Sequence, residues 1–475
     1  MTHNSYIFFG RQNISISKRT AVAGCFFFLA WLVILVIPGP ALKLIVQADR
    51  QSETEFRLDN GLTVYLLPYA GSPLVTMVLA VKVGSADETP ETSGLLHLLE
   101  HCLLFRQSHL VADNRLFRTI SQHGLYYNAR TEQDMMFFEI SLPADCLELG
   151  LGLLKDVIFS FNLTEEALAQ EKSVLLRELA DNSRQPEKVG LARIYELAFP
   201  ESGYALPVYG KEEVVRRADL TGLKNLHQKF FHPDNAALVV VGAVEPEKLR
   251  ETIKPIFLDL KGGGGRSERP PLPPQFPASG PQFELRMKVS DTYILAGLPA
   301  PGYNHPDRLP MDMLSELAGQ GLSPLIYQAF SGQSDLIYTA RFHYFNHEQT
   351  GLIFILVTSR EDRVPSVKRL LQNFLPRLAE MNYSLQDYLP DQQFLVFDFL
   401  QGGKNRFQWL SEKMTESPSV LALSLAKHLL LRDGRQPGNY LEAISRLDSS
   451  HLRQTARKYL TRSRPVWVVI KPEKQ

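Results

Sequence analysis

The stretch His97-Leu98-Leu99-Glu100-His101 places two imidazoles and a carboxylate within five residues of an otherwise apolar run. Positions i, i+3 and i+4 of a helix lie on one face, so His97 and His101 can converge on one metal ion with Glu100 beside it. Two histidines, one carboxylate and an open fourth position are the ligand set of a hydrolytic zinc site. The alternative is that these are ordinary polar positions on a solvated helix face.

The residues on both sides of this stretch favour the metal site. Leucines precede His97, and apolar residues continue after His101 to Phe105, which predicts a helix that is buried on all sides. Burying three ionisable groups without partners is costly, and a shared metal ion removes that cost. Cys102 points about 100° away from His101 around the helix, so it is expected to be a small packed side chain and not a ligand.

A third protein ligand is expected on a second helix, over residues 163–182. This segment contains Glu171 and Glu178, which are seven residues apart. Seven residues are close to two helical turns, so the two carboxylates point the same way. Taken alone, they are more typical of carboxylates on a solvated helix face.

With these residues in view, the sequence resembles the pitrilysin-type (M16, inverzincin) zinc peptidases, which carry H-x-x-E-H. In that family a ligand glutamate follows after about 76 residues, and 76 residues separate His101 from Glu178. The resemblance implies that His97, His101 and Glu178 bind one Zn²⁺ per chain. It implies that Glu100 is the general base. Glu171 occupies the family's second glutamate position, where it would support catalysis by orienting a ligand imidazole.

A later segment also resembles the family. Asn128-Ala129-Arg130-Thr131 matches its stretch leading into an edge strand, expected here near residues 135–142. The resemblance implies that an extended peptide substrate pairs with this strand by β-augmentation, with Asn128 and Ala129 as substrate-binding residues. Asn128 is equally compatible with a turn.

Length and composition set the broad class. The chain has 475 residues, of which 44% are hydrophobic and 21% charged, as expected for a globular protein of two domains. Basic and acidic residues number 51 each, so charge gives no reason to expect a nucleic-acid partner. Three cysteines do not make a disulfide framework.

The N-terminal region, residues 1–48, is predicted to contain a targeting segment. Residues 20–37 form an uncharged apolar run, and Arg11, Lys18 and Arg19 precede it without any acidic residue. As a helix this run spans roughly 27 Å, just enough for the hydrocarbon core of a membrane. We expect a signal peptide or an uncleaved membrane anchor, with the body on the extracytoplasmic (periplasmic) side. A buried helix is the remaining alternative.

A Gly/Pro-rich stretch at residues 261–282 divides the rest of the chain and is expected to be an exposed linker. It separates a metal-bearing domain (49–260) from a second domain without a metal motif (283–475). Each side opens with an alternating strand pattern, contains amphipathic helices and closes with a Val-rich strand. The predicted fold class is α+β, with two similar domains, each a mainly antiparallel sheet covered by helices on one side. The resemblance implies that they face each other as half of a clam shell.

The second half departs from the family in one respect. Family members usually place an arginine and a tyrosine seven residues apart in a later domain, where they hold the substrate and stabilise the oxyanion. Tyr338 matches this tyrosine, although it could also be a strand residue packed in the core, and Ser331 stands at the arginine position. The resemblance therefore implies either a heterodimer, whose partner supplies the Arg/Tyr pair, or a homodimer with weakened activity.

Two functions follow. The first is a zinc metalloendopeptidase, anchored in a membrane or exported, which cleaves peptides or unfolded segments in an enclosed chamber. The second, suggested by Ser331, is a non-catalytic scaffold subunit that retains the fold for assembly. The intact set of His97, Glu100, His101 and Glu178 favours the first.

Overall fold

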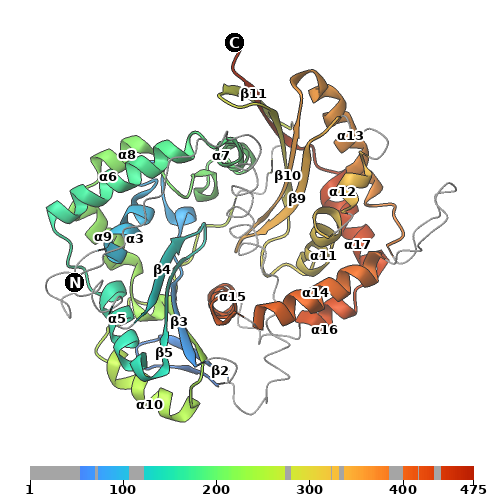
Figure 1. Cartoon of the computed structure of the whole chain (residues 1–475). Helices are drawn as coiled ribbons and strands as arrows, with labels where there is room; N and C mark the ends of the chain where they lie inside the picture. Colours follow the sequence, from blue (N-terminus) through green and yellow to red (C-terminus); the bar gives the residue numbers. More distant parts are fainter. Residues whose placement is uncertain are drawn as a thin grey trace, which may run out of the picture. The chain divides into compact units, whose positions relative to one another are not determined.

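The computed structural model (Figure 1) describes residues 54–69, 73–105, 122, 124–272, 276, 280–321, 324–330, 336–383, 399–415, 417–432 and 440–474. The expected N-terminal apolar segment and Ser331 lie outside these residues. Among the residues that are described, none of the helices combines the length and the hydropathy that a membrane crossing needs.

Six strands form the first sheet, in the order β1-β2-β6-β3-β5-β4. All neighbours are antiparallel except β2 and β6, which run parallel with Val64 opposite Leu238. The strand bounds are β1 Thr54–Arg57, β2 Thr63–Pro68, β3 Leu74–Val81, β4 Tyr126–Thr131, β5 Met136–Pro143 and β6 Ala236–Gly242.

The edge of this sheet differs from the expectation. The strand expected at the edge, near residues 135–142, is β5, and β5 is paired on both sides, with β3 and with β4. The expectation was wrong because the stretch before it is itself a strand, β4, which folds back onto β5. Within the described part of the chain, β4 is the last strand on that side. Asn128 lies inside β4, opposite Glu139, so its assignment to a turn was also wrong.

The second sheet repeats the pattern of the first. Its five strands have the order β7-β11-β8-β10-β9, and only β7 and β11 run parallel. In both sheets the strand that comes last in sequence lies next to the first long strand and parallel to it. The two similar sheet-plus-helix domains expected from the sequence are therefore confirmed, with mixed sheets. The bounds are β7 Gln282–Met287, β8 Thr292–Ala300, β9 Thr339–Asn346, β10 Gly351–Ser359 and β11 Val466–Pro472.

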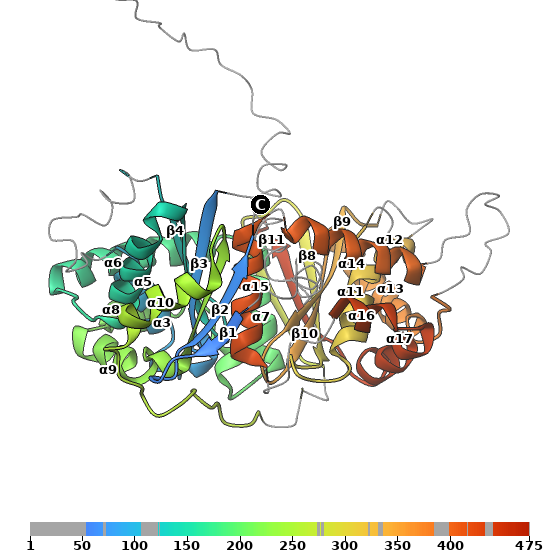
Figure 2. The same ribbon diagram turned by 90° about the horizontal axis from the view of Figure 1, so that it is seen from below.

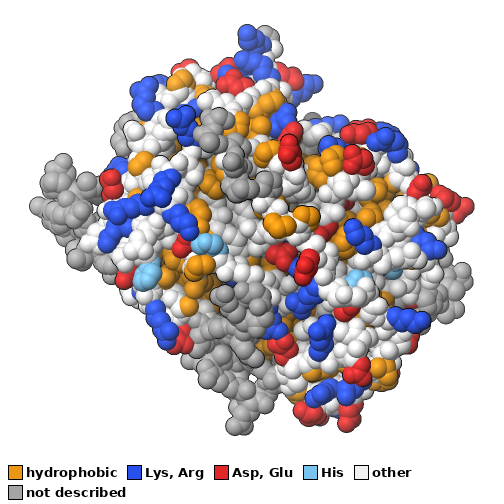
Figure 3. All heavy atoms as spheres, turned by 180° about the vertical axis from the view of Figure 1, so that it is seen from behind, with side chains coloured by type: hydrophobic (Ala, Val, Ile, Leu, Met, Phe, Trp, Pro, Cys, Tyr) orange, Lys and Arg blue, Asp and Glu red, His pale blue; other side chains and the backbone are white. Residues whose placement is uncertain are grey.

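Helices cover one face of each sheet and form two hydrophobic cores. In the first half they are α3 Leu95–Phe105, α5 Leu147–Phe159, α6 Glu165–Asn182, α8 Glu212–Arg217, α9 Leu220–Phe230 and α10 Pro246–Phe257. In the second half they are α11 Arg308–Gly319, α12 Leu325–Gln328, α13 Val364–Arg377, α14 Phe399–Thr415, α16 Tyr440–Ser445 and α17 Ser449–Ala456. Figure 3 shows basic and acidic side chains interspersed over one face of the molecule, as the equal numbers of the two lead one to expect.

The remaining two helices are exchanged between the halves. Helix α7 (Pro186–Ala198) packs on β8 and β11 of the second sheet, whereas α15 (Pro418–Leu431) packs on β3 and β6 of the first. Both lie between the sheets in Figures 1 and 2. The expectation of helices on one side only was therefore wrong. Strands β3 and β6 are almost uniformly apolar because both of their faces are buried.

Part of the Gly/Pro-rich linker is bound to the first half. The carboxylate of Asp234, which follows α9, accepts hydrogen bonds from the backbone N–H groups of Gly263, Gly264 and Gly265 at 2.8, 2.9 and 2.6 Å. Further along, the side chain of Arg269 is only 4% exposed. Residues 261–264 are exposed, as expected of a linker. The expectation is wrong at Arg269, because carboxylates enclose its guanidinium.

Candidate metal centre

A buried carboxylate and two glycines fix the position of the N-terminus of helix α3. Glu88 accepts hydrogen bonds from the N–H groups of Gly94 and Leu96, both at 2.8 Å, at the positive end of the helix. Gly94 has φ +96°, and a Cβ atom there would lie 2.6 Å from Cα of Gly210. Only glycine combines this backbone conformation with so close an approach. The first turn of α3 is thereby held against the segment that precedes α8.

The structure brings the three expected ligands together, from two helices. Nε2 of His101 lies 3.5 Å from Oε2 of Glu178, and Nε2 of His97 lies 3.9 Å from the same oxygen. The ligand atoms of these three residues all lie within 4.8 Å of one another. The two imidazole rings, from α3, are 4.9 Å apart at an angle of 71°. Glu178 belongs to α6, which packs against α3.

The chemistry and spacing of these donors fit a zinc ion. Zinc takes histidine nitrogen and carboxylate oxygen at about 2.0–2.2 Å, so neighbouring donors in a tetrahedral site are about 3.3–3.6 Å apart. The distances to Glu178, 3.5 and 3.9 Å, are close to that spacing. The imidazoles of His97 and His101 are 13% and 11% exposed, whereas Glu178 is 41% exposed. The site is therefore open on the side of Glu178, where a fourth ligand or a substrate could approach.

Electrostatics at the site favour a cation and a neutral His97. Burial lowers the pKa of His97, which keeps its imidazole in the neutral form that binds a metal. Burial also opposes the charge of His101, but hydrogen bonds to Glu171 and Glu178 outweigh it and raise its pKa to about 9. The hydrogen bond with His101 in turn lowers the pKa of Glu178 to about 2. The two carboxylates thus create a field in which a positive charge at His101 is stable.

The imidazole of His101 is oriented through its second nitrogen. Nδ1 of His101 lies 3.6 Å from Oε2 of Glu171, which is 6% exposed, and this leaves Nε2 directed at Glu178. Such a partner fixes the ring and its tautomer. The structure therefore places Glu171 where the resemblance implied.

Glu100 lies on the same helix as both imidazoles and is 5% exposed. Its Oε2 accepts a hydrogen bond of 2.6 Å from the hydroxyl of Thr131, the last residue of β4. Asn128 and Ala129 lie on β4, with the Asn128 side chain exposed and Ala129 packed against the core. A chain that paired with the outer edge of β4 would therefore run toward the carboxylate of Glu100.

Two linked polar side chains, Asn182 at the end of α6 and Lys188 of α7, lie next to Glu178. Asn182 is 3% exposed and hydrogen-bonds the side chain of Glu178, four residues earlier. Its Oδ1 accepts a hydrogen bond of 2.7 Å from Nζ of Lys188, in the first turn of α7. The exchanged helix α7 thus places a cation close to a ligand carboxylate.

Tyr338 lies in the second half, immediately before β9, and is 56% exposed. Its alternative assignment to a packed core position was therefore wrong. The residues that the structure brings together at the metal centre all come from the first half of the chain.

Sequence reasoning missed several residues that support the site. Thr131 was quoted within the edge-strand stretch, but nothing in the pattern gave it a contact with Glu100. Asn182 stands at i+4 from Glu178, and this helical spacing could have identified it. Arg269, considered below, lay inside a stretch whose composition predicted only a linker.

Comparisons with known proteins agree with this geometry. Residues 64–212 match the family described as insulinase (peptidase family M16), and residues 217–388 match the peptidase M16 inactive domain. The zinc protease PqqE of Helicobacter pylori is 25% identical over 449 residues, which cover 93% of this chain and 97% of that protein. The mitochondrial-processing peptidase subunit beta of Blastocladiella emersonii is 24% identical over 266 residues, 55% of this chain and 56% of that subunit.

Solved structures show the same fold. A protease from Helicobacter pylori superimposes with a TM-score of 0.77 at 22% identity, over 88% of this chain and 99% of that one. The peptidase M16 inactive domain from Pseudomonas fluorescens gives a TM-score of 0.75 at 14% identity, over 89% and 98% of the two chains. Two adjoining family models, similar zinc proteases and a shared fold lead to one conclusion: the chain belongs to the M16 family of peptidases.

Proposed function

We propose that this protein is a zinc-dependent endopeptidase. The observation that carries the proposal is the convergence of His97, His101 and Glu178 at one open point, with Glu100 on the same helix face. The names of similar zinc proteases support it at the level of the family.

In the proposed reaction, each residue of the site has a separate role. His97, His101 and Glu178 would hold a zinc ion, which would supply Lewis acidity for the scissile carbonyl and for water. Glu100 accepts the proton of the attacking water and returns it to the leaving amine nitrogen. Thr131 holds the Glu100 carboxylate in place through its 2.6 Å hydrogen bond. Glu171 keeps His101 oriented toward the metal position.

The substrate class follows from the edge strand. A peptide can add to the outer side of β4 only in an extended conformation, because the pairing uses backbone hydrogen bonds at every second residue. We therefore propose peptides or unfolded segments as substrates, with Asn128 and Ala129 lining their path. Most segments of a folded protein are already paired in helices or sheets and are not available for such pairing.

A second subunit is part of the proposal. Ser331 stands where an arginine is expected, so a partner would supply the Arg/Tyr pair, either as a heterodimer or, with weaker activity, as a second copy that offers Tyr338. Relatives named as subunits alpha and beta of mitochondrial-processing peptidase support a partner of the same family.

We further propose that residues 20–37 direct the protein to or across a membrane, which leaves the peptidase on the periplasmic side.

The test uses the full chain, together with any partner that co-purifies with it. We expect about one zinc per chain and cleavage of a fluorogenic unstructured peptide. Glu100→Gln should retain zinc but lose cleavage by at least about 100-fold, because only the proton acceptor is removed. Glu178→Gln should lose zinc, whereas Glu166→Gln, an exposed change on the same helix, should change neither.

The competing function is a scaffold subunit, suggested by Ser331 and by the match to an inactive domain. Wild-type protein that contains no zinc, or that cleaves nothing even with its partner, would support the scaffold. Cleavage that survives Glu100→Gln would remove the assigned general base.

A further inference from the structure

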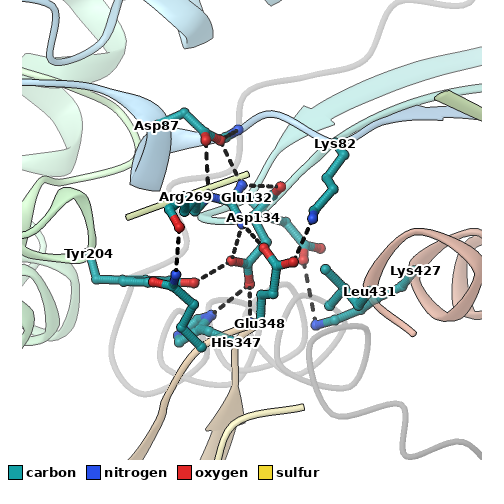
Figure 4. A network of polar contacts seen from close by, with 12 residues as sticks. Lys82, Asp87, Glu132, Asp134, Tyr204, Arg269, His347, Glu348, Lys427 and Leu431 are labelled. Carbon is teal, nitrogen blue, oxygen red and sulfur yellow. Dashed lines mark hydrogen bonds and ion pairs between the residues drawn. The ribbon is translucent and has the colours of Figure 1, made fainter. Parts of the chain in front are cut away.

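A buried arginine in the linker connects both halves of the molecule. The guanidinium of Arg269 binds both carboxylate oxygens of Asp87, at 3.0 and 2.6 Å. It also donates to the carboxylate and the backbone carbonyl of Asp134, at 2.9 and 2.6 Å, and to Glu348 at 2.6 Å. Figure 4 shows these groups converging on one side chain. Asp87 and Asp134 belong to the first half, and Glu348 belongs to the second.

The contribution of the second half is the turn between β9 and β10. Glu348 of this turn also binds Lys82 at 2.5 Å, and its backbone N–H donates to Asp134 at 3.1 Å. The neighbouring His347 lies 3.4 Å from the carboxylate of Asp134 and shares a 2.7 Å hydrogen bond with Tyr195 of α7. The turn is thus held against the first half by several polar contacts, with Arg269 at their centre.

Two routes lead from Arg269 to the metal-binding helix. Along the first, Asp87 is followed directly by Glu88, whose carboxylate binds the N–H groups of Gly94 and Leu96 at the start of α3. Along the second, Asp134 lies in the turn between β4 and β5, three residues after Thr131, which binds Glu100.

The two routes are also joined to each other. The N–H groups of Ser85 and Ala86 donate to the carbonyls of Glu132 and Gln133, at 3.1 and 2.9 Å. The loop before α3 and the turn after β4 are therefore bonded directly to each other. Arg269 binds the loop at Asp87 and the turn at Asp134, so its guanidinium fixes their common position.

The shape of the guanidinium matters as well as its charge. Arg269, Asp87 and Asp134 have side chains only 4%, 5% and 3% exposed. Burial opposes the charge of Asp134, but the hydrogen bond with His347 and the charge of Arg269 outweigh it and lower the pKa of Asp134, which keeps this buried carboxylate ionised. A lysine at this position could restore a charge, but it cannot form the two parallel bonds to Asp87.

We propose that Arg269 is a positioning residue for the metal centre: it holds the start of α3 and the end of β4 in the arrangement that aligns Glu100. This inference rests on the proposed peptidase function. A purely structural role is the alternative, because an arginine that joins the halves elsewhere need not affect the site. Arg341 of β9 provides that comparison: it binds Glu187 at 2.9 Å, and Glu187 belongs to α7, the helix from the first half of the sequence that packs on the second sheet.

The experiment compares Arg269→Gln, Arg269→Lys and Arg341→Gln in the full protein. We measure kcat and KM on an unstructured peptide, zinc content, and hydrogen exchange of residues 95–105 in the metal-free protein. Both Arg269 variants should lower kcat about tenfold with KM within about twofold, and should increase exchange in the first turn of α3. Arg341→Gln should leave kcat and this exchange as in the wild type.

Each outcome has a separate meaning. Unchanged kcat and unchanged exchange in a folded Arg269 variant overturn the inference, and so does an equal effect of Arg341→Gln. If Arg269→Gln does not fold, Arg269→Lys, which keeps the charge but cannot form the two parallel bonds to Asp87, decides the question: wild-type kcat and α3 exchange in that variant also overturn the inference. An inactive wild-type protein counts against the proposed function instead, and the exchange measurement then still decides the role of Arg269.

Discussion

The hydroxyl of Thr131, at the end of edge strand β4, donates a hydrogen bond of 2.6 Å to the carboxylate of Glu100 on helix α3. The two residues are 31 positions apart in the sequence. The strand proposed to bind the substrate and the group proposed to accept the proton therefore share a direct contact. A change at Thr131 should affect the chemical step more than substrate binding.

Thr131→Val removes the donor while keeping the size and branching of the side chain. We expect kcat to fall roughly tenfold with little change in KM, because Glu100 loses the bond that orients it. Steady-state kinetics on an unstructured peptide measure this. Thr131→Ser retains the hydroxyl and should stay near the wild type. Equal losses in both variants would mean that packing, and not the hydrogen bond, is responsible.

Glu171→Gln is expected to weaken zinc binding without abolishing it. The carboxylate of Glu171 lies 3.6 Å from Nδ1 of His101, and loss of such a support typically lowers metal affinity 10–100-fold. Competition with a chromophoric chelator measures the affinity. Glu166→Gln, on an exposed part of the same helix, should leave it unchanged. Wild-type affinity in Glu171→Gln would show that His101 does not depend on this partner.

Asn182→Ala should also reduce zinc affinity, by several-fold, because Glu178 loses a hydrogen-bonding neighbour. Lys188→Met breaks the 2.7 Å bond to Asn182 but leaves Asn182 in place, so its effect should be smaller. Arg184→Gln removes a nearby exposed cation and is the matched control. A larger loss in Lys188→Met than in Asn182→Ala would indicate that the charge of Lys188 acts on the site directly.

Asp234→Asn should destabilise the protein in a pH-dependent way. Burial opposes the charge of Asp234, but hydrogen bonds from Gly263, His232 and Gly265 outweigh it and lower its pKa to about 2. The unfolded chain protonates this group near pH 3.9. The ionised carboxylate therefore stabilises the fold fully above about pH 5, and this contribution is lost as the pH falls through 4 toward 2.

Urea unfolding of Asp234→Asn and the wild type at pH 7, 5 and 3 tests this expectation. The free energies of unfolding should differ by about 2 kcal/mol at pH 7 and 5, as for hydrogen bonds to a charged group, and by less at pH 3. A difference that stays constant down to pH 3 would contradict the assignment of the stabilisation to the ionised carboxylate. It would also weaken the case that this residue anchors the linker.

Much of the metal centre could be predicted from the sequence because its determinants are local. His97, Glu100 and His101 share one helical turn, and Glu171 and Glu178 share one face of a second helix, so helical periodicity alone groups them. The apolar residues around His97 predicted correctly that α3 is buried. The pairing of the two helices across 76 intervening residues came from the resemblance to the family and not from periodicity.

Other features could not be predicted because they depend on long-range packing. The edge position of β4 follows from which strands pair, and the alternation pattern of a single strand does not reveal its neighbours. The packing of α7 on the second sheet and of α15 on the first could likewise not be predicted. The apolar pattern of a helix indicates that it is buried, but not against which sheet. Composition at residues 261–282 predicted a linker, but it gave no indication that Arg269 would bind three carboxylates.

The sequence by itself determined the paired imidazoles and Glu100, because residue type and helical spacing fix which side chains of one helix can face one ion. Glu178 joined this set only through the resemblance to the family. The sequence also determined the presence of two α+β domains, since hydrophobic patterns are repeated on both sides of the linker. Only the tertiary structure decided what surrounds that ion: Thr131 at Glu100, Lys188 behind Glu178, and Arg269 between the halves. These contacts join residues far apart in sequence, and their geometry arises only when the sheets and the exchanged helices have packed.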